Sequence, residues 1–240
     1  MKMTDITRQA RKLLPLGYCG AVIVAAGSAS RMGGIDKVMA PLGGEPMIVK
    51  TVRAFQACDA IREIVVVTRP DLILPIMELC HTFDKVRAVV AGGSSRQKSV
   101  KLGLNSLSDK VKLAAVQDGA RPLVTWQVID RAVRAAHSFG AAAPAIPVKD
   151  TIKEAVGGVV KKTPDRATLF AVQTPQVFDF HLLRAAMKKV EQDGVQVTDD
   201  CSAVEYLGMT VKLVEGDERN LKVTTPLDLK IAEMLLEEEK

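Results

Sequence analysis

Short runs rich in valine and alanine alternate with helical patterns from Gly20 to Ile146. This alternation is typical of βαβ units, in which parallel strands form a sheet that helices cover on both faces. We expect an α/β fold with a mostly parallel central sheet, and ligands of such sheets bind beyond the carboxyl ends of the strands. The expected strands are Gly20–Val24, Glu63–Thr68, Arg87–Val90, Ala114–Gln117 and Gly140–Ile146, and the expected helices are Pro46–Ala57, Leu72–Thr82, Ser95–Leu107 and Thr125–Ser138.

The loop after the first expected strand places two cations among small residues. Ala25, Ala26 and Gly27 lead into this loop, and Arg31 and Lys37 follow. Small side chains let backbone N–H groups come close to an anion, and the cations offset its charge. We interpret the loop as a site for a nucleotide triphosphate, where the cations stabilise charge on an attacked phosphorus. An ordinary turn with two solvated cations is the alternative.

The same loop differs from the two best-known phosphate-binding loops. It matches neither GxxxxGK(S/T) nor GxGxxG. This argues against a P-loop NTPase and against a dinucleotide-binding turn.

One segment interrupts the alternation of strands and helices. Two short apolar stretches flank Gly157-Gly158 between Val148 and Thr163, which predicts a β-hairpin. An isolated two-stranded hairpin is marginally stable in water, so it needs a second surface, either its own domain or another subunit. We expect a single domain over residues 1–240, with an N-terminal extension over residues 1–17 and a protruding β-arm over residues 148–165.

Composition narrows the choice of partners. The net charge is +5, 25% of the residues are charged and 4% are aromatic. The mild charge suits an anionic small molecule, and the chain lacks the basic clusters and stacking aromatic residues typical of nucleic-acid binding. No apolar run reaches membrane-spanning length, and residues 1–16 lack the uninterrupted apolar region of a secretory signal. We therefore expect neither nucleic acid nor membrane as a partner.

The cysteines point to a reducing compartment. The four cysteines are scattered without a CxxC pair, and the three histidines do not cluster with them. This pattern predicts buried, reduced thiols in a cytoplasmic protein rather than a zinc site.

Two further stretches follow expected strands. Gly93, Ser94 and Ser99 lie where backbone groups freed by adjacent glycines could read the edge of a base, although a helix N-cap at Ser94 or Ser95 is compatible with the same pattern. Asp118 ends an apolar strand, a usual place for a contact with Mg²⁺ or ribose, and an Asp that begins a turn is the alternative. Taken alone, Lys222 would be a surface lysine and Thr198 a helix N-cap.

Taken in order, these stretches resemble the 2-C-methyl-D-erythritol 4-phosphate cytidylyltransferase family of the non-mevalonate isoprenoid pathway. The resemblance runs from about Tyr18 to Ile231. It implies a Rossmann-like nucleotidyltransferase fold and the transfer of a cytidylyl group from CTP to a polyol phosphate. The matching residues are Ala25-Ala26-Gly27 with Arg31-Met32, Lys37, Gly92-Gly93 with Arg96 and Ser99-Val100, Asp118 with Ala120-Arg121-Pro122, Asp150-Thr151, Arg166 ahead of Gln173-Thr174-Pro175-Gln176, Thr198-Asp199, and Asn220 with Lys222-Val223-Thr224.

The resemblance also implies residue roles. Arg31 and Lys37 would stabilise the attacked α-phosphate, and Arg166 and Lys222 would position the acceptor phosphate; these four are the predicted catalytic residues. Asp118 would lie between ribose, acceptor and Mg²⁺, with the metal held mainly by the CTP phosphates. The predicted substrate-binding residues are Ala25, Ala26, Gly27, Gly93, Ser94, Ser99, Asp118, Gly119, Arg121, Thr151 and Thr198.

The family exchanges its hairpin arm between subunits. Thr151 and Arg166 would therefore serve the partner's site in a homodimer. This agrees with the separate expectation that the hairpin needs a second surface.

Several positions depart from the family pattern. Ala29 replaces a glycine, Asp36 and Val38 flank Lys37, and Gln117-Asp118-Gly119 replaces a His-Asp-Ala sequence. These changes concern the nucleotide half of the site.

Two other functions fit parts of the sequence. A related cytidylyltransferase acting on another polyol phosphate, such as D-ribitol 5-phosphate, would share the nucleotide half. A non-catalytic nucleotide-binding module would need neither Arg31 nor Lys37, so the presence of both cations argues against it.

Overall fold

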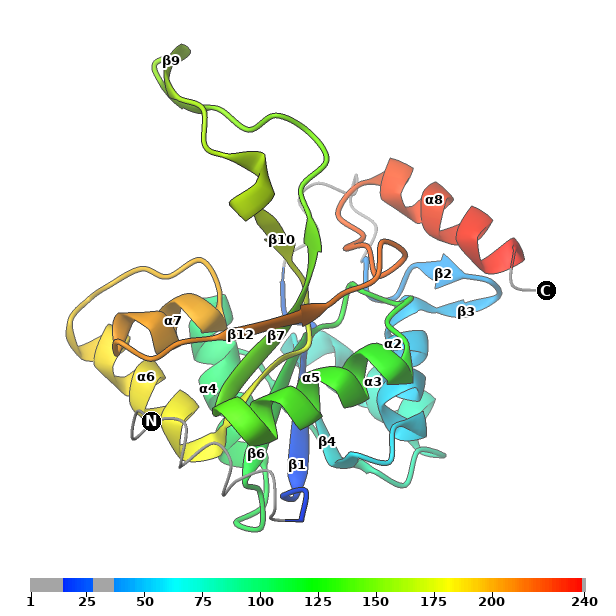
Figure 1. The fold of residues 1–240 in the computed structure, drawn as a ribbon. Coiled ribbons are helices and arrows are strands. Elements are labelled where there is room, and N and C mark those ends of the chain that lie inside the picture. The colour runs from blue at the N-terminus through cyan, green and yellow to red at the C-terminus, as the bar shows by residue number, and fades with distance from the viewer. Residues whose placement is uncertain (1–14, 28–36, 239–240) are drawn as a thin grey trace.

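The computed structural model of the chain describes residues 15–27 and 37–238 (Figure 1). Its main sheet contains β1 (Cys19–Val24), β4 (Ile61–Thr68), β5 (Val86–Ala91), β6 (Leu113–Asp118), β7 (Ala141–Pro147), β10 (Phe170–Val172), β11 (Gln176–Asp179) and β12 (Lys212–Glu215). The strands follow the order β10-β7-β11-β6-β1-β4-β5, and β12 also pairs with β7.

One half of this sheet is parallel. Strands β6, β1, β4 and β5 run in the same direction, and all residues of β4 but one are buried, as expected for a strand covered on both faces. In the other half, β11 is antiparallel to β6 and β7, and β10 is antiparallel to β7. The expected mostly parallel sheet is confirmed, and each of the five expected strands lies within two residues of its predicted bounds.

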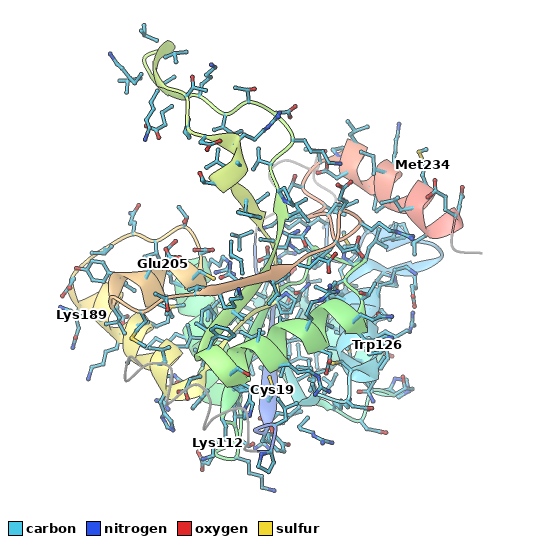
Figure 2. All side chains as sticks on the ribbon, in the orientation of Figure 1. Cys19, Lys112, Trp126, Lys189, Glu205 and Met234 are labelled. Atoms are coloured by element: carbon cyan, nitrogen blue, oxygen red, sulfur yellow. The ribbon has the colours of Figure 1, made fainter. Side chains whose placement is uncertain are left out.

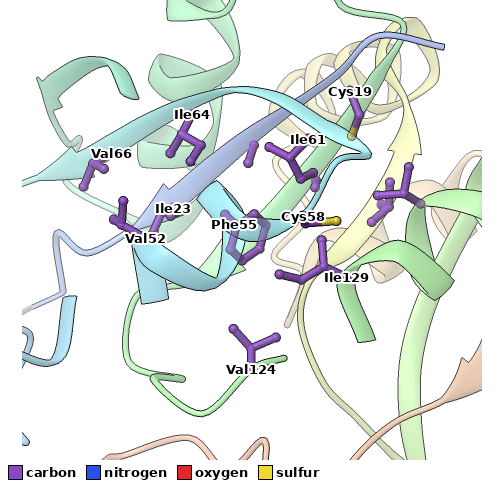
Figure 3. Close-up of a cluster of buried hydrophobic side chains, with 14 of the residues drawn as sticks. Cys19, Ile23, Val52, Phe55, Cys58, Ile61, Ile64, Val66, Val124 and Ile129 are labelled. Atoms are coloured by element: carbon purple, nitrogen blue, oxygen red, sulfur yellow. The ribbon is translucent and has the colours of Figure 1, made fainter. Parts of the chain in front are cut away.

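Helices cover both faces of the sheet. On one face pack α2 (Met47–Ala57), α3 (Ile73–Cys80) and α5 (Trp126–Phe139), and on the other pack α4 (Arg96–Ser106), α6 (Phe180–Gln192) and α7 (Asp200–Tyr206). Successive residues of β1 point to opposite faces: Ile23 belongs to the cluster with Phe55 and Ile129 (Figure 3), and Val22 belongs to the cluster with Leu104. The four expected helices are confirmed as α2, α3, α4 and α5.

The parallel register brings three chain segments to one edge of the sheet. Val24 at the end of β1 pairs with Val67 of β4 and with Asp118 of β6. The loop that follows β1, the end of β6 and the connection from β5 to α4 therefore meet there. Ligands of parallel sheets bind at this edge.

The hairpin is present but shorter than expected. It consists of β8 (Glu154–Val156) and β9 (Val159–Lys162), joined at Gly157 and Gly158 with φ values of 57° and 80°. Two successive residues with positive φ are what a tight hairpin turn requires. The expectation of strand structure from residue 148 was wrong, because the Val148 N–H still donates to the Leu169 carbonyl but residues 148–153 form no further ladder.

The hairpin belongs to an arm that stands away from the sheet (Figure 1), and its side chains point outward (Figure 2). All residues from 151 to 163 are exposed. Val156, Val159 and Val160 are 68%, 61% and 53% exposed. No surface among residues 15–27 and 37–238 covers these apolar strand residues.

The remaining elements lie mostly in the C-terminal third. The sequence patterns did not predict α6, α7, β12 or α8 (Pro226–Glu237), which packs through Ala232 on Leu42 of a small hairpin, β2 (Pro41–Leu42) and β3 (Glu45–Pro46). Short 3-10 turns span η1 (Pro70–Leu72) and η2 (Arg166–Thr168). In the part of the chain that the structure describes, no helix has both the length and the apolar character needed to cross a membrane.

The prediction of buried, reduced thiols is confirmed. Cys19, Cys58, Cys80 and Cys201 are all buried and none forms a disulfide. Burial raises the pKa of the Cys80 thiol to about 11, so this group stays a neutral thiol at physiological pH.

Candidate active site

A cavity of about 420 Å³ opens at the edge where β1, β6 and the start of α4 meet. It has the size of a small-ligand pocket. Residues from segments far apart in the sequence line it. Nine of the predicted site residues are among them, namely Ala25, Ala26, Gly27, Lys37, Gly93, Ser94, Ser99, Asp118 and Lys222.

The first wall of the cavity is the chain that leaves β1. The N–H of Ala25 donates to the carbonyl of Val67 at 2.7 Å, which continues the parallel ladder to the rim. A Cβ on Gly27 would lie 3.8 Å from the Lys37 ammonium, so the small residue brings the backbone close to this cation. Close approach of backbone and cation is what an anion site requires. Arg31, Ala29 and Asp36 lie outside the described residues.

The second wall is the loop from β5 into α4. The N–H of Gly93 donates to Ser99 Oγ at 3.1 Å, and Ser99 Oγ donates to the Ser95 carbonyl at 2.9 Å. A Cβ on Gly93 would lie 2.4 Å from Lys98 Cβ, so only glycine fits. Ser95 accepts from the Lys98 N–H at 3.2 Å and caps α4. The capping interpretation is thus confirmed for Ser95, in a loop that also lines the cavity.

Asp118 lies at the floor of the cavity among three cations. Its Oδ2 is 2.8 Å from Lys222 Nζ and 3.7 Å from Arg121 Nε, and its Oδ1 is 3.6 Å from Arg96 Nε. Burial alone would raise the pKa of Asp118, but the charges of Lys222, Arg96 and Arg121 together outweigh it and lower the pKa. The carboxylate is therefore ionised and held between cations on both of its oxygens.

The segment that carries Lys222 is anchored by Asn220, two residues earlier. Asn220 is fully buried, and its Nδ2 donates to the Thr174 carbonyl at 2.9 Å and to Gln173 Oε1 at 3.3 Å. Its own carbonyl accepts from Arg121 Nη1 at 2.6 Å. The sequence analysis gave Asn220 and Gln173 no role, although both belong to the matched motifs.

The sequence analysis also missed Arg96, which lines the cavity. Its Nη2 donates to Asp200 Oδ2 at 2.8 Å. Asp200 is fully buried; burial raises the pKa of Asp200, and the Arg96 charge opposes this rise. Its place in the matched motif, between Gly92-Gly93 and Ser99, could have indicated a role for Arg96 from the sequence.

Two other predicted residues lie beside the cavity without lining it. Arg121 contacts Asp118 and Asn220, as described above. A Cβ on Gly119 would lie 3.1 Å from Ala25 Cβ and from the Val24 carbonyl, so the glycine lets β6 approach the end of β1. Val38, one of the positions that depart from the family pattern, is buried and lines the cavity, and its carbonyl accepts from the Ile48 N–H at 2.9 Å.

The remaining three predicted residues are not brought to the cavity within one subunit. Thr151 and Arg166 are exposed at the base of the arm, where Arg166 Nη1 donates to the Lys149 carbonyl at 2.9 Å. Thr198 is exposed, and its hydroxyl lies 3.1 Å from Ser202 Oγ. The N-cap of α7 is Asp199, which accepts from the Ser202 N–H, so the alternative of a cap at Thr198 was wrong by one residue.

A parallel half-sheet with a cation-lined cavity beyond its strand ends defines a Rossmann-like nucleotidyltransferase fold. Solved structures of this class are similar to the chain. The crystal structure of 4-diphosphocytidyl-2C-methyl-D-erythritol synthase from Anaerococcus prevotii matches with a TM-score of 0.84 and 31% identity, covering 92% of this chain and 96% of that one. The 2-C-methyl-D-erythritol 4-phosphate cytidylyltransferase of Thermus thermophilus matches with a TM-score of 0.76 and 32% identity, covering 90% and 98%.

Sequence comparison identifies the particular family. The family model for 2-C-methyl-D-erythritol 4-phosphate cytidylyltransferase matches residues 19–238. Relatives with that name are 43% identical in Caldanaerobacter subterraneus (90% of this chain and 97% of the relative) and 45% identical in Symbiobacterium thermophilum (91% and 92%). The chain belongs to the 2-C-methyl-D-erythritol 4-phosphate cytidylyltransferase family, as the motifs predicted.

Proposed function

We propose that this enzyme transfers a cytidylyl group from CTP to 2-C-methyl-D-erythritol 4-phosphate, giving 4-diphosphocytidyl-2-C-methyl-D-erythritol and pyrophosphate in the non-mevalonate isoprenoid pathway. Membership of the family supports this reaction. The observation that carries it is the lining of one cavity by Lys37, Asp118 and Lys222. Cations from the predicted nucleotide half and the predicted acceptor half therefore face the same space.

The reaction is a single in-line displacement. A phosphate oxygen of the acceptor attacks the α-phosphorus of CTP, the bond from that phosphorus to the bridging oxygen of the β-phosphate breaks, and pyrophosphate leaves. The enzyme forms no covalent intermediate, so it needs no nucleophile activated by a base. Its task is to bring two anions together and to stabilise the charge that develops. We assign this task to Lys37 and Arg31 at the triphosphate and to Lys222 and Arg166 at the acceptor phosphate.

We propose Mg²⁺ as the metal, held mainly by the CTP phosphates. Asp118 is the carboxylate at the cavity, and Mg²⁺ commonly takes one or two carboxylates together with substrate phosphates. Bound there, the metal would neutralise the charge of the departing pyrophosphate.

We further propose a homodimer in which the arm of each subunit completes the partner's cavity. The exposed valines of the hairpin support this, because no other described part of the chain covers them. The exposed positions of Thr151 and Arg166 on the same arm agree with a role in a second subunit. We also propose a cytoplasmic location, which the buried cysteines without disulfides support.

The test is pyrophosphate release from CTP and Mg²⁺ with three acceptor conditions: 2-C-methyl-D-erythritol 4-phosphate, D-ribitol 5-phosphate, and no acceptor. Release with the methylerythritol phosphate alone is the expected result. Release with ribitol phosphate alone would assign the enzyme to a different acceptor. If CTP binds but pyrophosphate is released in none of the three conditions, an enzymatic function is contradicted.

A further inference from the structure

Arg96 connects three elements at the cavity. It is the first residue of α4, its Nη2 donates to Asp200 Oδ2 at 2.8 Å, and its Nε lies 3.6 Å from Asp118 Oδ1. Asp118 ends β6, and Asp200 begins α7. One guanidinium therefore lies between the carboxylates of two elements that come from distant parts of the chain.

The Asp200 carboxylate depends on Arg96 for its orientation. Asp200 is fully buried, and among the described residues its Oδ1 has no hydrogen-bond partner. Gln176 holds the backbone of this turn, because its Oε1 accepts from the N–H groups of Asp200 and Cys201. The Asp200 side chain instead accepts from Arg96, and a buried carboxyl group without such a partner is costly. Arg96 thus ties the start of α7, two residues after Thr198, to the start of α4.

The two oxygens of the Asp118 carboxylate have different partners. Oδ1 faces Arg96, whereas Oδ2 lies 2.8 Å from Lys222 Nζ. A guanidinium has its donors in a rigid planar fork, whereas a lysine ammonium is a compact charge on a flexible stem. Arg96 at Oδ1, together with Arg121 at 3.7 Å from Oδ2, therefore constrains the direction of the Asp118 carboxylate and with it the place of the Lys222 ammonium.

We propose that Arg96 is a positioning residue for the acceptor half of the site: it sets the direction of the Asp118 carboxylate against Lys222, and through Asp200 it sets the place of Thr198. This inference rests on the proposed function, since it assigns Thr198 and Lys222 to the acceptor. It gives the cavity wall at the start of α4 a second task beyond the nucleotide loop, namely the coupling of that loop to the acceptor residues.

The test compares Arg96→Lys, Asp200→Asn and the double variant with the wild-type enzyme. In each we would measure CTP affinity by calorimetry without acceptor, and kcat and the acceptor KM from pyrophosphate release. Arg96→Lys should lower kcat/KM for the acceptor about 10- to 100-fold, because a small displacement of positioned groups has an effect of this size. CTP affinity should stay within about threefold of the wild type, a split that general destabilisation does not produce.

The double variant tests the connection through Asp200. If Arg96 acts through this carboxylate, the double variant should be about as impaired as the worse single variant. Effects that multiply, or an Asp200→Asn variant with normal acceptor kinetics, would overturn the part of the proposal that concerns α7. Asp200→Asn keeps the shape of the side chain, so it decides the question if Arg96→Lys fails to fold.

Lys101→Met is the matched control. Lys101 lies on α4 one turn after the loop and pairs with Glu191 at 2.6 Å, with both side chains about half exposed. An exposed pair contributes little, so this variant should keep all parameters within about twofold. An Arg96→Lys enzyme as active as this control would overturn the proposal. A wild-type enzyme without activity on 2-C-methyl-D-erythritol 4-phosphate would contradict the proposed function instead, so the two failures are distinguishable.

Discussion

The proposed nucleotide half and the proposed acceptor half of the site are built in different ways. The walls around Lys37 and Gly93 lie at the ends of two parallel strands, β1 and β5. The acceptor half is assembled from the segment around Lys222, the start of α7 and an exposed arm. The first half rests on a rigid sheet, whereas the second depends on long-range polar contacts and, in our proposal, on another subunit. Variants in the two halves should therefore fail in different ways.

The largest effect is expected in the nucleotide half. Lys37→Ala should lower kcat about 10²- to 10³-fold, because it removes a preorganised charge at the attacked phosphate. Folding should be unchanged by circular dichroism, since this variant removes no core residue. Lys110→Ala removes an exposed charge beside the amino end of β6, far from the cavity, and serves as the control. Turnover of the Lys37 variant close to that of the control would remove Lys37 from its proposed role.

The second prediction asks whether the arm belongs to the neighbour's site. Arg166→Ala should lower kcat/KM for the acceptor about 10²-fold with little change in CTP affinity, because the residue would hold the acceptor phosphate. Differently tagged Arg166→Ala and Lys37→Ala subunits can then be co-expressed and the mixed dimers compared with each parent. In a mixed dimer with exchanged arms, one cavity has an intact Lys37 and receives an intact Arg166.

Equal mixing should restore about a quarter of wild-type activity, since half of the dimers are mixed and each has one complete site of two. Activity no higher than the average of the two parent variants would mean that each arm serves its own subunit. Mixing Lys110→Ala subunits with Arg166→Ala subunits is the control, because the Lys110→Ala partner has an intact site.

A smaller effect is expected at the buried Asn220, two residues before Lys222. Asn220→Ala removes the hydrogen bonds to the Thr174 carbonyl and to Gln173 Oε1, and the latter then accepts only from the Asp217 N–H. It should lower the free energy of unfolding by about 1–3 kcal/mol, measured by urea denaturation, and raise the acceptor KM as Lys222 loses its support. Lys222→Met is the matched variant, which should impair the acceptor kinetics with a smaller loss of stability. An Asn220→Ala enzyme with normal acceptor kinetics would show that Lys222 does not depend on Asn220.

The smallest effect concerns the start of α8, directly after the acceptor segment. Asp228 Oδ2 accepts from the N–H groups of Thr224 and Thr225 and from the Thr224 hydroxyl, each at 2.8 Å. Burial opposes ionisation of Asp228, but these hydrogen bonds outweigh it and lower the pKa. A lowered pKa means that the carboxylate stabilises the fold above its unfolded-state pKa and that this contribution is lost as the pH falls through the folded-state value.

Asp228→Asn should therefore lower the free energy of unfolding by about 1 kcal/mol at pH 7, the usual size of a capping contribution. The difference from the wild type should shrink toward acid pH, as the wild-type carboxyl becomes protonated. Urea denaturation at pH 7 and at about pH 3 measures both values. A difference that stays constant over this range would mean that the charge of Asp228 has no part in the cap.

Sequence reasoning succeeded where structure follows from local pattern. The strands of the parallel half were predicted within two residues. Three of them, β1, β4 and β6, are almost fully buried, and such strands appear as short continuous apolar runs. The turn at Gly157 and Gly158 was predicted because few residues other than glycine adopt two successive positive φ values. The small residues and Lys37 after β1 were predicted to bind an anion for the same local reason, and they do line the cavity.

The same reasoning failed where a residue's environment comes from distant chain. The N-cap of α7 was placed one residue early, since Thr198 and Asp199 both have capping side chains and only the folded turn selects between them. The strand expected from residue 148 did not form, because pairing requires a neighbour that the pattern does not reveal. Asn220 has an ordinary polar side chain in the sequence, and only its burial against Gln173 and Thr174 shows what it does.

The amino-acid sequence by itself thus determined the parallel half-sheet, the small residues and the Lys37 cation that line the cavity, the hairpin turn and the family. These depend on the size, polarity and backbone freedom of residues that are close in the chain. The tertiary structure alone decided that Asp118 lies among Arg96, Arg121 and Lys222, and that Arg96 pairs with Asp200 across 104 residues of chain. Electrostatic contacts of this kind act through space, so they exist only after the sheet has brought the ends of its strands together.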